Sequence, residues 1–111
     1  MDRAGDGLVA VFEGPTRAIR SAQAIQREAR SLSVELRAGV HTGEVDLDSA
    51  GIRGIAVHTT ARVCGAAGAG ELLVTSTVRD LTAGAQLAFE DRGLHELKGV
   101  PEPRQLFAVV R

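Results

Sequence analysis

The sequence predicts an α+β domain with one layer of helices on a mixed sheet. The hydrophobic period changes between 3.6 and 2 residues along the chain, and short β-branched apolar runs alternate with longer amphipathic segments. The 111 residues are 44% hydrophobic and 24% charged, which suits a single domain spanning 1–111 with one core. The expected order is strand, helix, strand, helix and then mostly strands.

The first predicted strand is the apolar run at residues 8–12, which ends before Gly14-Pro15. Proline is tolerated in the first turn of a helix, where its missing N–H would have no partner, so a helix is expected to begin at about Pro15. Apolar residues then recur at spacings of three and four and predict the buried face of that helix. They are Ala18, Ala22, Ile25, Ala29 and Leu32.

Residues 34–40 alternate between apolar and polar, which predicts a strand with one buried face. Residues 44–51 are acidic and turn-like, and a second helix is expected over 55–64, ended by the Gly/Ala stretch at 65–70. Its expected apolar face carries Val57, Ala61 and Cys64.

The C-terminal third reads as strands around one short helix. Thr77, with Asp80 three residues later, resembles a cap that opens one or two helical turns through Leu81. Arg92-Gly93 reads as the turn of a hairpin. The predicted strands are 72–75, 87–91, 94–97 and 105–110.

Composition excludes several classes of function. The net charge of −1 argues against broad nucleic-acid binding, and the absence of Trp and Tyr excludes a surface that stacks successive bases. The three phenylalanines, Phe12, Phe89 and Phe107, are expected in the core. A single cysteine, Cys64, and the lack of a long apolar run favour a cytoplasmic chain without membrane insertion.

Three residues are candidates for chemistry. Asp6 stands in a glycine-flanked turn, where a carboxylate can bind Mg²⁺ together with substrate phosphates, although Asp-Gly is also a common turn dipeptide. Arg62 follows His58 by four residues, so one helix face could present both to one ligand. The alternative is a solvated helix face. The three histidines lie far apart in sequence and predict no metal site.

Four segments, in the same order and at compatible spacings, resemble the class III adenylyl/guanylyl cyclase homology domain of the actinobacterial type. They are GDGLVAVF at 5–12, RAGVHTGE at 37–44, GIAVHTTARV at 54–63, and FEDRG through LKGV at 89–100. The resemblance implies a ferredoxin-like sheet with helices on one face, and a head-to-tail homodimer that binds ATP or GTP at its interface. It also implies two Mg²⁺ or Mn²⁺ ions on two aspartates, and conversion of ATP to 3′,5′-cyclic AMP and pyrophosphate.

Within this resemblance, Asp6 matches the second metal aspartate and Arg62 matches the arginine that stabilises the transition state. His58 stands at the family's catalytic asparagine position. Asp2 and Gly51 stand where the base-selecting residues are expected. The F-x-D-I-x-G-F-T string that carries the first metal aspartate does not occur in these residues.

These departures predict an N-terminally truncated cyclase domain with little or no activity alone. The missing first strand would lie between residues 8–12 and 34–45, so either those strands close up or a second copy fills the gap. One alternative is a working cyclase whose missing motif lies upstream of Met1. Another is a pseudo-cyclase that binds nucleotide, or only dimerises, to regulate a partner.

Overall fold

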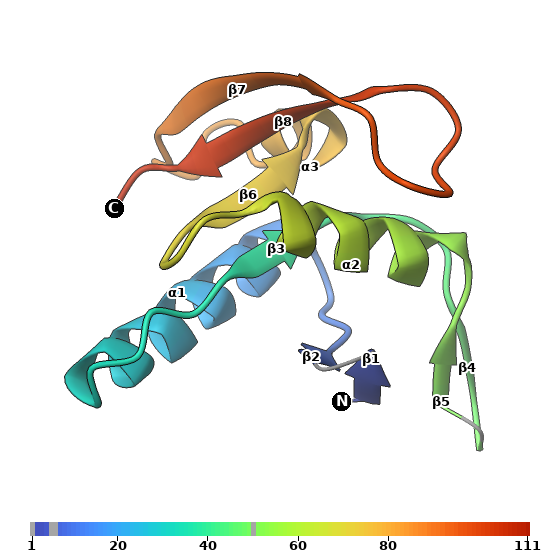
Figure 1. Cartoon of the computed structure of the whole chain (residues 1–111), viewed down its shortest axis with the longest axis horizontal. Helices are drawn as coiled ribbons and strands as arrows, with labels where there is room; N and C mark the ends of the chain where they lie inside the picture. Colours follow the sequence, from blue (N-terminus) through green and yellow to red (C-terminus); the bar gives the residue numbers. More distant parts are fainter. Residues whose placement is uncertain (1, 5–6, 50) are drawn as a thin grey trace.

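The computed structural model describes residues 2–4, 7–49 and 51–111 and confirms the α+β class (Figure 1). Its main sheet has the order β3-β6-β8-β7, with β3 and β6 parallel and the other neighbours antiparallel. These strands are β3 (Ala38–Val40), β6 (Leu72–Thr75), β8 (Arg104–Val109) and β7 (Phe89–His95). Two hairpins stand apart from it, β1 (Asp2–Ala4) with β2 (Gly7–Val9), and β4 (Asp46–Asp48) with β5 (Gly51–Arg53).

Three helices pack on the sheet: α1 (Pro15–Ser31), α2 (Ile55–Ala66) and α3 (Ser76–Leu81). The predicted start at Pro15 is confirmed, and α2 runs two residues beyond its predicted end. The short helix begins one residue after Thr75 and not at a Thr77 cap. None of the described helices is long and apolar enough to cross a membrane.

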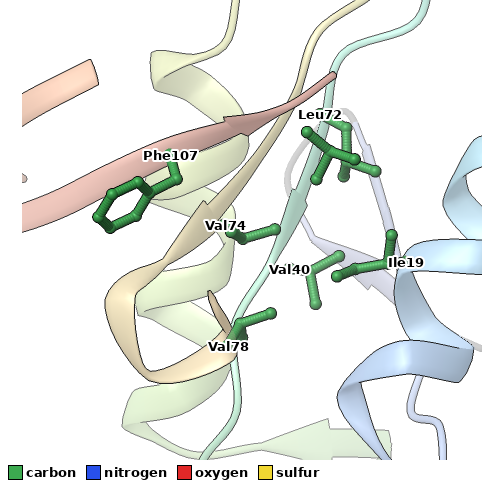
Figure 2. Close-up of a cluster of buried hydrophobic side chains, with 7 residues drawn as sticks. Ile19, Val40, Leu72, Val74, Val78 and Phe107 are labelled. Atoms are coloured by element: carbon green, nitrogen blue, oxygen red, sulfur yellow. The ribbon is translucent and has the colours of Figure 1, made fainter. Parts of the chain in front are cut away.

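The core consists of two clusters on opposite faces of the sheet. Successive side chains of a strand point to opposite faces, and Val74 belongs to one cluster while its neighbour Leu73 belongs to the other. Ile19 of α1 and Val78 of α3 pack with Val74 on the first face (Figure 2). Val63 of α2 packs with Leu73 on the second. The helices are therefore divided between both faces, whereas the sequence predicted helices on one face.

The strand expected at residues 8–12 is shorter and lies elsewhere. β2 ends at Val9 and pairs with β1 in a hairpin outside the main sheet, so residues 10–12 continue past the end of its ladder. Val11 is 47% exposed and Phe12 is 40% exposed. The prediction that all three phenylalanines are buried is therefore wrong for Phe12, although Phe107 lies in the core.

The alternating segment at 34–40 pairs only over its last three residues. Its neighbour β6 begins at Leu72, which stands opposite Ala38, so the earlier residues extend past that strand. Val34 and Leu36 are exposed, against the expected buried face. β2 and β3 belong to different sheets, so they have not closed up as neighbours.

The predicted helix faces agree with the observed ones only in part. Ala18 and Ala22 of α1 pack against the first core cluster as predicted, but Ile25 and the C-cap residue Leu32 are exposed, and the buried positions are Ile19 and Gln26. In α2 the core-facing residues are Ala56, Thr59 and Val63. Alanine and threonine occur on both sides of α2, so apolar spacing alone could not fix which side is buried.

Two connections also differ from the prediction. The acidic segment at 44–51 is not a plain turn, because it contributes β4 and the start of the β4–β5 hairpin. The expected hairpin around Arg92-Gly93 is one continuous strand, β7, with a register shift between Asp91 and Leu94. A glycine-containing pair suits a bulge as well as a turn, and here the strand continues past it.

Candidate functional site

The candidate site lies on the side of α2 that faces away from the core. Positions 54, 58 and 62 follow one another at intervals of four, and 57 and 61 lie beside them, so they form one helix face. The core-facing residues of α2 lie on the opposite side. This face and the end of β5 line a shallow open pocket of about 520 Å³. The lining residues are Ile52, Arg53, Gly54, Val57, His58, Ala61 and Arg62.

His58 and Arg62 lie together on this face, as their spacing predicted. The Nε2 atom of His58 is 2.9 Å from the carbonyl oxygen of Lys98. A carbonyl oxygen can only accept, so Nε2 carries the hydrogen and donates it, which leaves Nδ1 as the ring's other polar atom. A Cβ at Gly99 would lie 2.6 Å from Nε2, and Gly99 has φ +79°, so this turn requires glycine.

Arg62 is exposed on the outer side of α2, one turn beyond His58. Its guanidinium keeps its positive charge at any physiological pH and offers N–H groups in a fork that fits phosphate oxygens. The site therefore provides a permanent cation next to an imidazole that already has one backbone partner.

Arg53 is a lining residue that the sequence did not single out. It is the last residue of β5 and directly precedes Gly54, the N-cap of α2. Its guanidinium forms an ion pair with the carboxylate of Asp48 across the β4–β5 hairpin. In the sequence, only its position beside the glycine that precedes α2 could have indicated a site role for Arg53. The four-residue spacing of His58 and Arg62 holds within a helix and does not include a residue of β5.

The metal prediction is not tested by the described residues. Asp6 lies outside them, so its assignment as a ligand remains a prediction. Across the described ranges there is no group of three or more His, Cys, Asp or Glu side chains that could hold a metal ion. The polar side chains of the pocket carry nitrogen, whereas Mg²⁺ prefers oxygen ligands, so this part of the site does not fit that cation.

Gly51 and the two other histidines lie outside this pocket. Gly51 opens β5 with φ +117°, a backbone conformation that favours glycine. His41 Nδ1 lies 2.9 Å from the hydroxyl of Thr75, and burial, followed by the charge of Arg104, lowers the pKa of His41. His95 bonds through Nε2 to the carbonyl of Arg92. These two histidines have structural partners.

No family model matches the chain, but solved structures of known proteins share its fold. The crystal structure of an adenylate/guanylate cyclase/hydrolase from Silicibacter pomeroyi superposes with a TM-score of 0.82 and 26% identity, over 97% of this chain and 69% of that one. The guanylate cyclase domain of RhGC from Catenaria anguillulae, solved with GTP, has the same fold at a TM-score of 0.70 and 20% identity, over 91% of this chain and 62% of that one.

Two sequence relatives extend the comparison. An uncharacterised protein of Mycobacterium tuberculosis is 34% identical over 102 residues, which cover 89% of this chain and 35% of the relative. A Rhizobium meliloti protein, whose name assigns it provisionally to the adenylate cyclases, is 26% identical over 110 residues, covering 91% of this chain and 19% of the relative.

The fold thus supports a nucleotide cyclase-like domain. Its structural neighbours are class III adenylate/guanylate cyclase domains. The chain spans about a third of the length of the curated mycobacterial relatives that it matches.

Proposed function

We propose that this domain binds a nucleoside triphosphate, ATP in the first place, with Arg62 against its phosphates, and that alone it forms little or no cyclic nucleotide. The observation that carries the proposal is the pairing of Arg62 with His58 in one open pocket on the outer face of α2. The similarity to the Silicibacter pomeroyi cyclase supports the substrate class.

The chemistry of cyclisation explains why this arginine matters. The ribose 3′-oxygen attacks the α-phosphorus, the bond from that phosphorus to the bridging oxygen breaks, and pyrophosphate leaves with the negative charge. A guanidinium held near these oxygens stabilises the developing charge through charge-assisted hydrogen bonds. Arg62 is suited to that role because its charge does not depend on pH.

His58 explains the low turnover that we propose. The family places an asparagine amide at this position, whereas the Nε2–H of His58 is directed to the backbone of Lys98. Loss of one preorganised donor costs about 2.7–4 kcal/mol of transition-state stabilisation, which is about a hundredfold to a thousandfold in kcat. Gly51 adds no side chain at a base-selecting position, so discrimination between ATP and GTP should also be weak.

A second copy of the chain is the proposed partner. The pocket is shallow and Arg62 projects from an open helix face, which suits a site completed by another protomer. In such a homodimer, Arg62 of one copy would act on the nucleotide held largely by its partner. Mg²⁺ or Mn²⁺ on Asp6 remains part of this proposal.

The test measures binding and turnover separately. Purified protein is titrated with ATP and with GTP, and cyclic AMP and cyclic GMP are quantified in the presence of Mg²⁺ or Mn²⁺. We expect ATP to bind at least tenfold more weakly to Arg62→Ala, and Arg17→Ala, an exposed arginine of α1, to behave as wild type. Absence of nucleotide binding would overturn the proposal. Robust cyclic AMP formation that is lost in Asp6→Ala and Arg62→Ala would overturn its low-turnover part.

A regulatory pseudo-cyclase is the second candidate. It is favoured by the hydrogen bond from the Nε2–H of His58 to the Lys98 carbonyl, because that N–H is then not free to bind a nucleotide. It predicts nucleotide binding with no cyclic product in any variant, including His58→Asn, which restores the family amide. A gain of cyclic nucleotide in His58→Asn would favour a weakened enzyme over this regulatory role.

A further inference from the structure

We infer that Arg53 is a second cationic contact for a polyphosphate in the α2 pocket and that Asp48 limits the affinity of this contact. The inference deepens the proposed function, since it assigns the part of the ligand that the pocket recognises. It depends on the ligand being a polyphosphate anion and not on which nucleoside is attached.

The two arginines enter the pocket from different elements. Arg53 comes from the end of β5, beside the first turn of α2, and Arg62 comes from the second half of the helix. Arg62 follows Gly54 by eight residues, so the two positions are about 12 Å apart along the axis of α2. Two long guanidinium side chains at such a separation suit an extended anion with several charged groups better than a single phosphate.

The lining has the charge that such an anion requires. Besides the two arginines, its only other ionisable side chain is His58, and the described lining residues include no carboxylate. Arginine forms paired hydrogen bonds with phosphate oxygens, so each guanidinium can hold one phosphate group. The other side chains of the lining, Ile52, Val57 and Ala61, are apolar and offer no competing acceptor.

Asp48 limits the affinity of Arg53 for a polyphosphate. Its carboxylate pairs with Arg53 across the hairpin, and the two side chains are 43% and 63% exposed. An exposed ion pair of this kind contributes little to stability, so an incoming phosphate can replace the carboxylate. The exchange still costs the ion pair and leaves a negative charge near the ligand. Removing that charge should therefore tighten binding, and removing Arg53 should weaken it.

The experiment uses inorganic tripolyphosphate as the probe. The whole chain is titrated calorimetrically at low ionic strength without divalent cations, because salt screens exposed charges. Arg53→Gln should weaken binding about tenfold, and Asp48→Asn should strengthen it several-fold. The matched controls are Arg79→Gln and Asp80→Asn, which change an exposed ion pair on α3 and should leave the affinity unaltered. Thermal melts of each variant check that the fold is retained.

The outcomes separate this inference from the proposed function. If ATP binding depends on Arg62 but Arg53→Gln and Asp48→Asn change nothing, the role of Arg53 is overturned and the proposed function stands. If tripolyphosphate binding depends on Arg53 while ATP and GTP do not bind, the proposed function fails and the anion site stands. If tripolyphosphate does not bind to the wild-type chain, the inference is overturned.

Discussion

His58 of α2 and Lys98 of the turn before β8 are joined by a hydrogen bond from the imidazole Nε2 to the backbone carbonyl oxygen, at 2.9 Å. The turn also contributes Leu97 and Val100 to the cluster that packs beneath α2. His58, a residue of the candidate site, therefore also connects α2 to the turn before β8. Substitutions at His58 should consequently change stability as well as ligand binding.

The first prediction concerns this bond. His58→Ala should lower the free energy of unfolding by about 0.5–1.5 kcal/mol, the usual contribution of one hydrogen bond. It should also speed amide exchange at Val100, whose N–H bonds to the carbonyl of Leu97. His95→Ala, which removes a histidine–carbonyl bond within β7, serves as the control and should leave that amide unchanged. Unaltered exchange at Val100 in His58→Ala would contradict the prediction.

The second prediction concerns Gln26, a buried amide of α1. Its Nε2 lies 2.9 Å from the carbonyl oxygen of Leu36, 3.1 Å from that of Glu71 and 3.4 Å from that of Gly70. Gln26→Ala should destabilise the fold by about 1–3 kcal/mol, because the part-buried carbonyl of Leu36 loses its donor, whereas those of Glu71 and Gly70 keep the Ala38 N–H and Arg111.

Urea denaturation measures this change, and Gln23→Ala on the same helix is the matched control. We expect the control to lie within about 0.5 kcal/mol of wild type, as is usual for substitutions away from such contacts. Equal effects of the two substitutions would show that the carbonyl contacts do not stabilise the fold.

The third prediction concerns pH. Burial, and then the charge of Arg104, lowers the pKa of His41, so the unfolded chain binds a proton more readily than the folded chain does. Stability should therefore be complete above the unfolded pKa of about 6.5 and should fall as the pH is lowered from there towards the folded pKa. Urea midpoints at pH 7.5 and 5.5 should differ more in wild type than in His41→Gln. A pH dependence unchanged by the substitution would refute this assignment.

The fourth prediction uses two glycines. A Cβ at Gly39 would lie 2.6 Å from the backbone nitrogen of Cys64, so Gly39→Ala must push α2 away from β3 and should cost about 1–3 kcal/mol. Gly65, inside α2, has nothing within 4 Å of the same added atom. Gly65→Ala should stabilise the protein by about 0.5–1 kcal/mol, because alanine is the better helix former. Thermal melts of the pair test whether the two signs are opposite.

Local sequence patterns predicted the elements whose residues strongly favour one secondary structure. The apolar run at 72–75 is β6, buried at every position, and Gly14-Pro15 marks the start of α1. The segment at 34–40 has equally clear alternation, yet a strand also needs a neighbour, and β6 reaches only as far as Ala38. Gln26 is buried because three carbonyl groups converge on it from distant segments, which no periodicity can reveal.

The candidate site divides in the same way. The interval of four residues placed His58 and Arg62 on one helix face, because helical geometry determines that relationship locally. The contact of His58 with Lys98 spans 40 residues, and Arg53 reaches the pocket through the β4–β5 hairpin, where the sequence predicts a turn. Contacts of this kind follow from tertiary packing, so the sequence alone could not supply them.

The position of β3 has a consequence for how the protein behaves at high concentration. β3 is an edge strand of a parallel pair, and the residues just before it, Val34 and Leu36, are apolar and exposed. Such an edge can template intermolecular strand pairing, although three residues of ladder offer few hydrogen bonds for it. Self-templated aggregation on storage or heating is therefore expected to nucleate at residues 34–40, and a lysine at Val34 is the simplest protection.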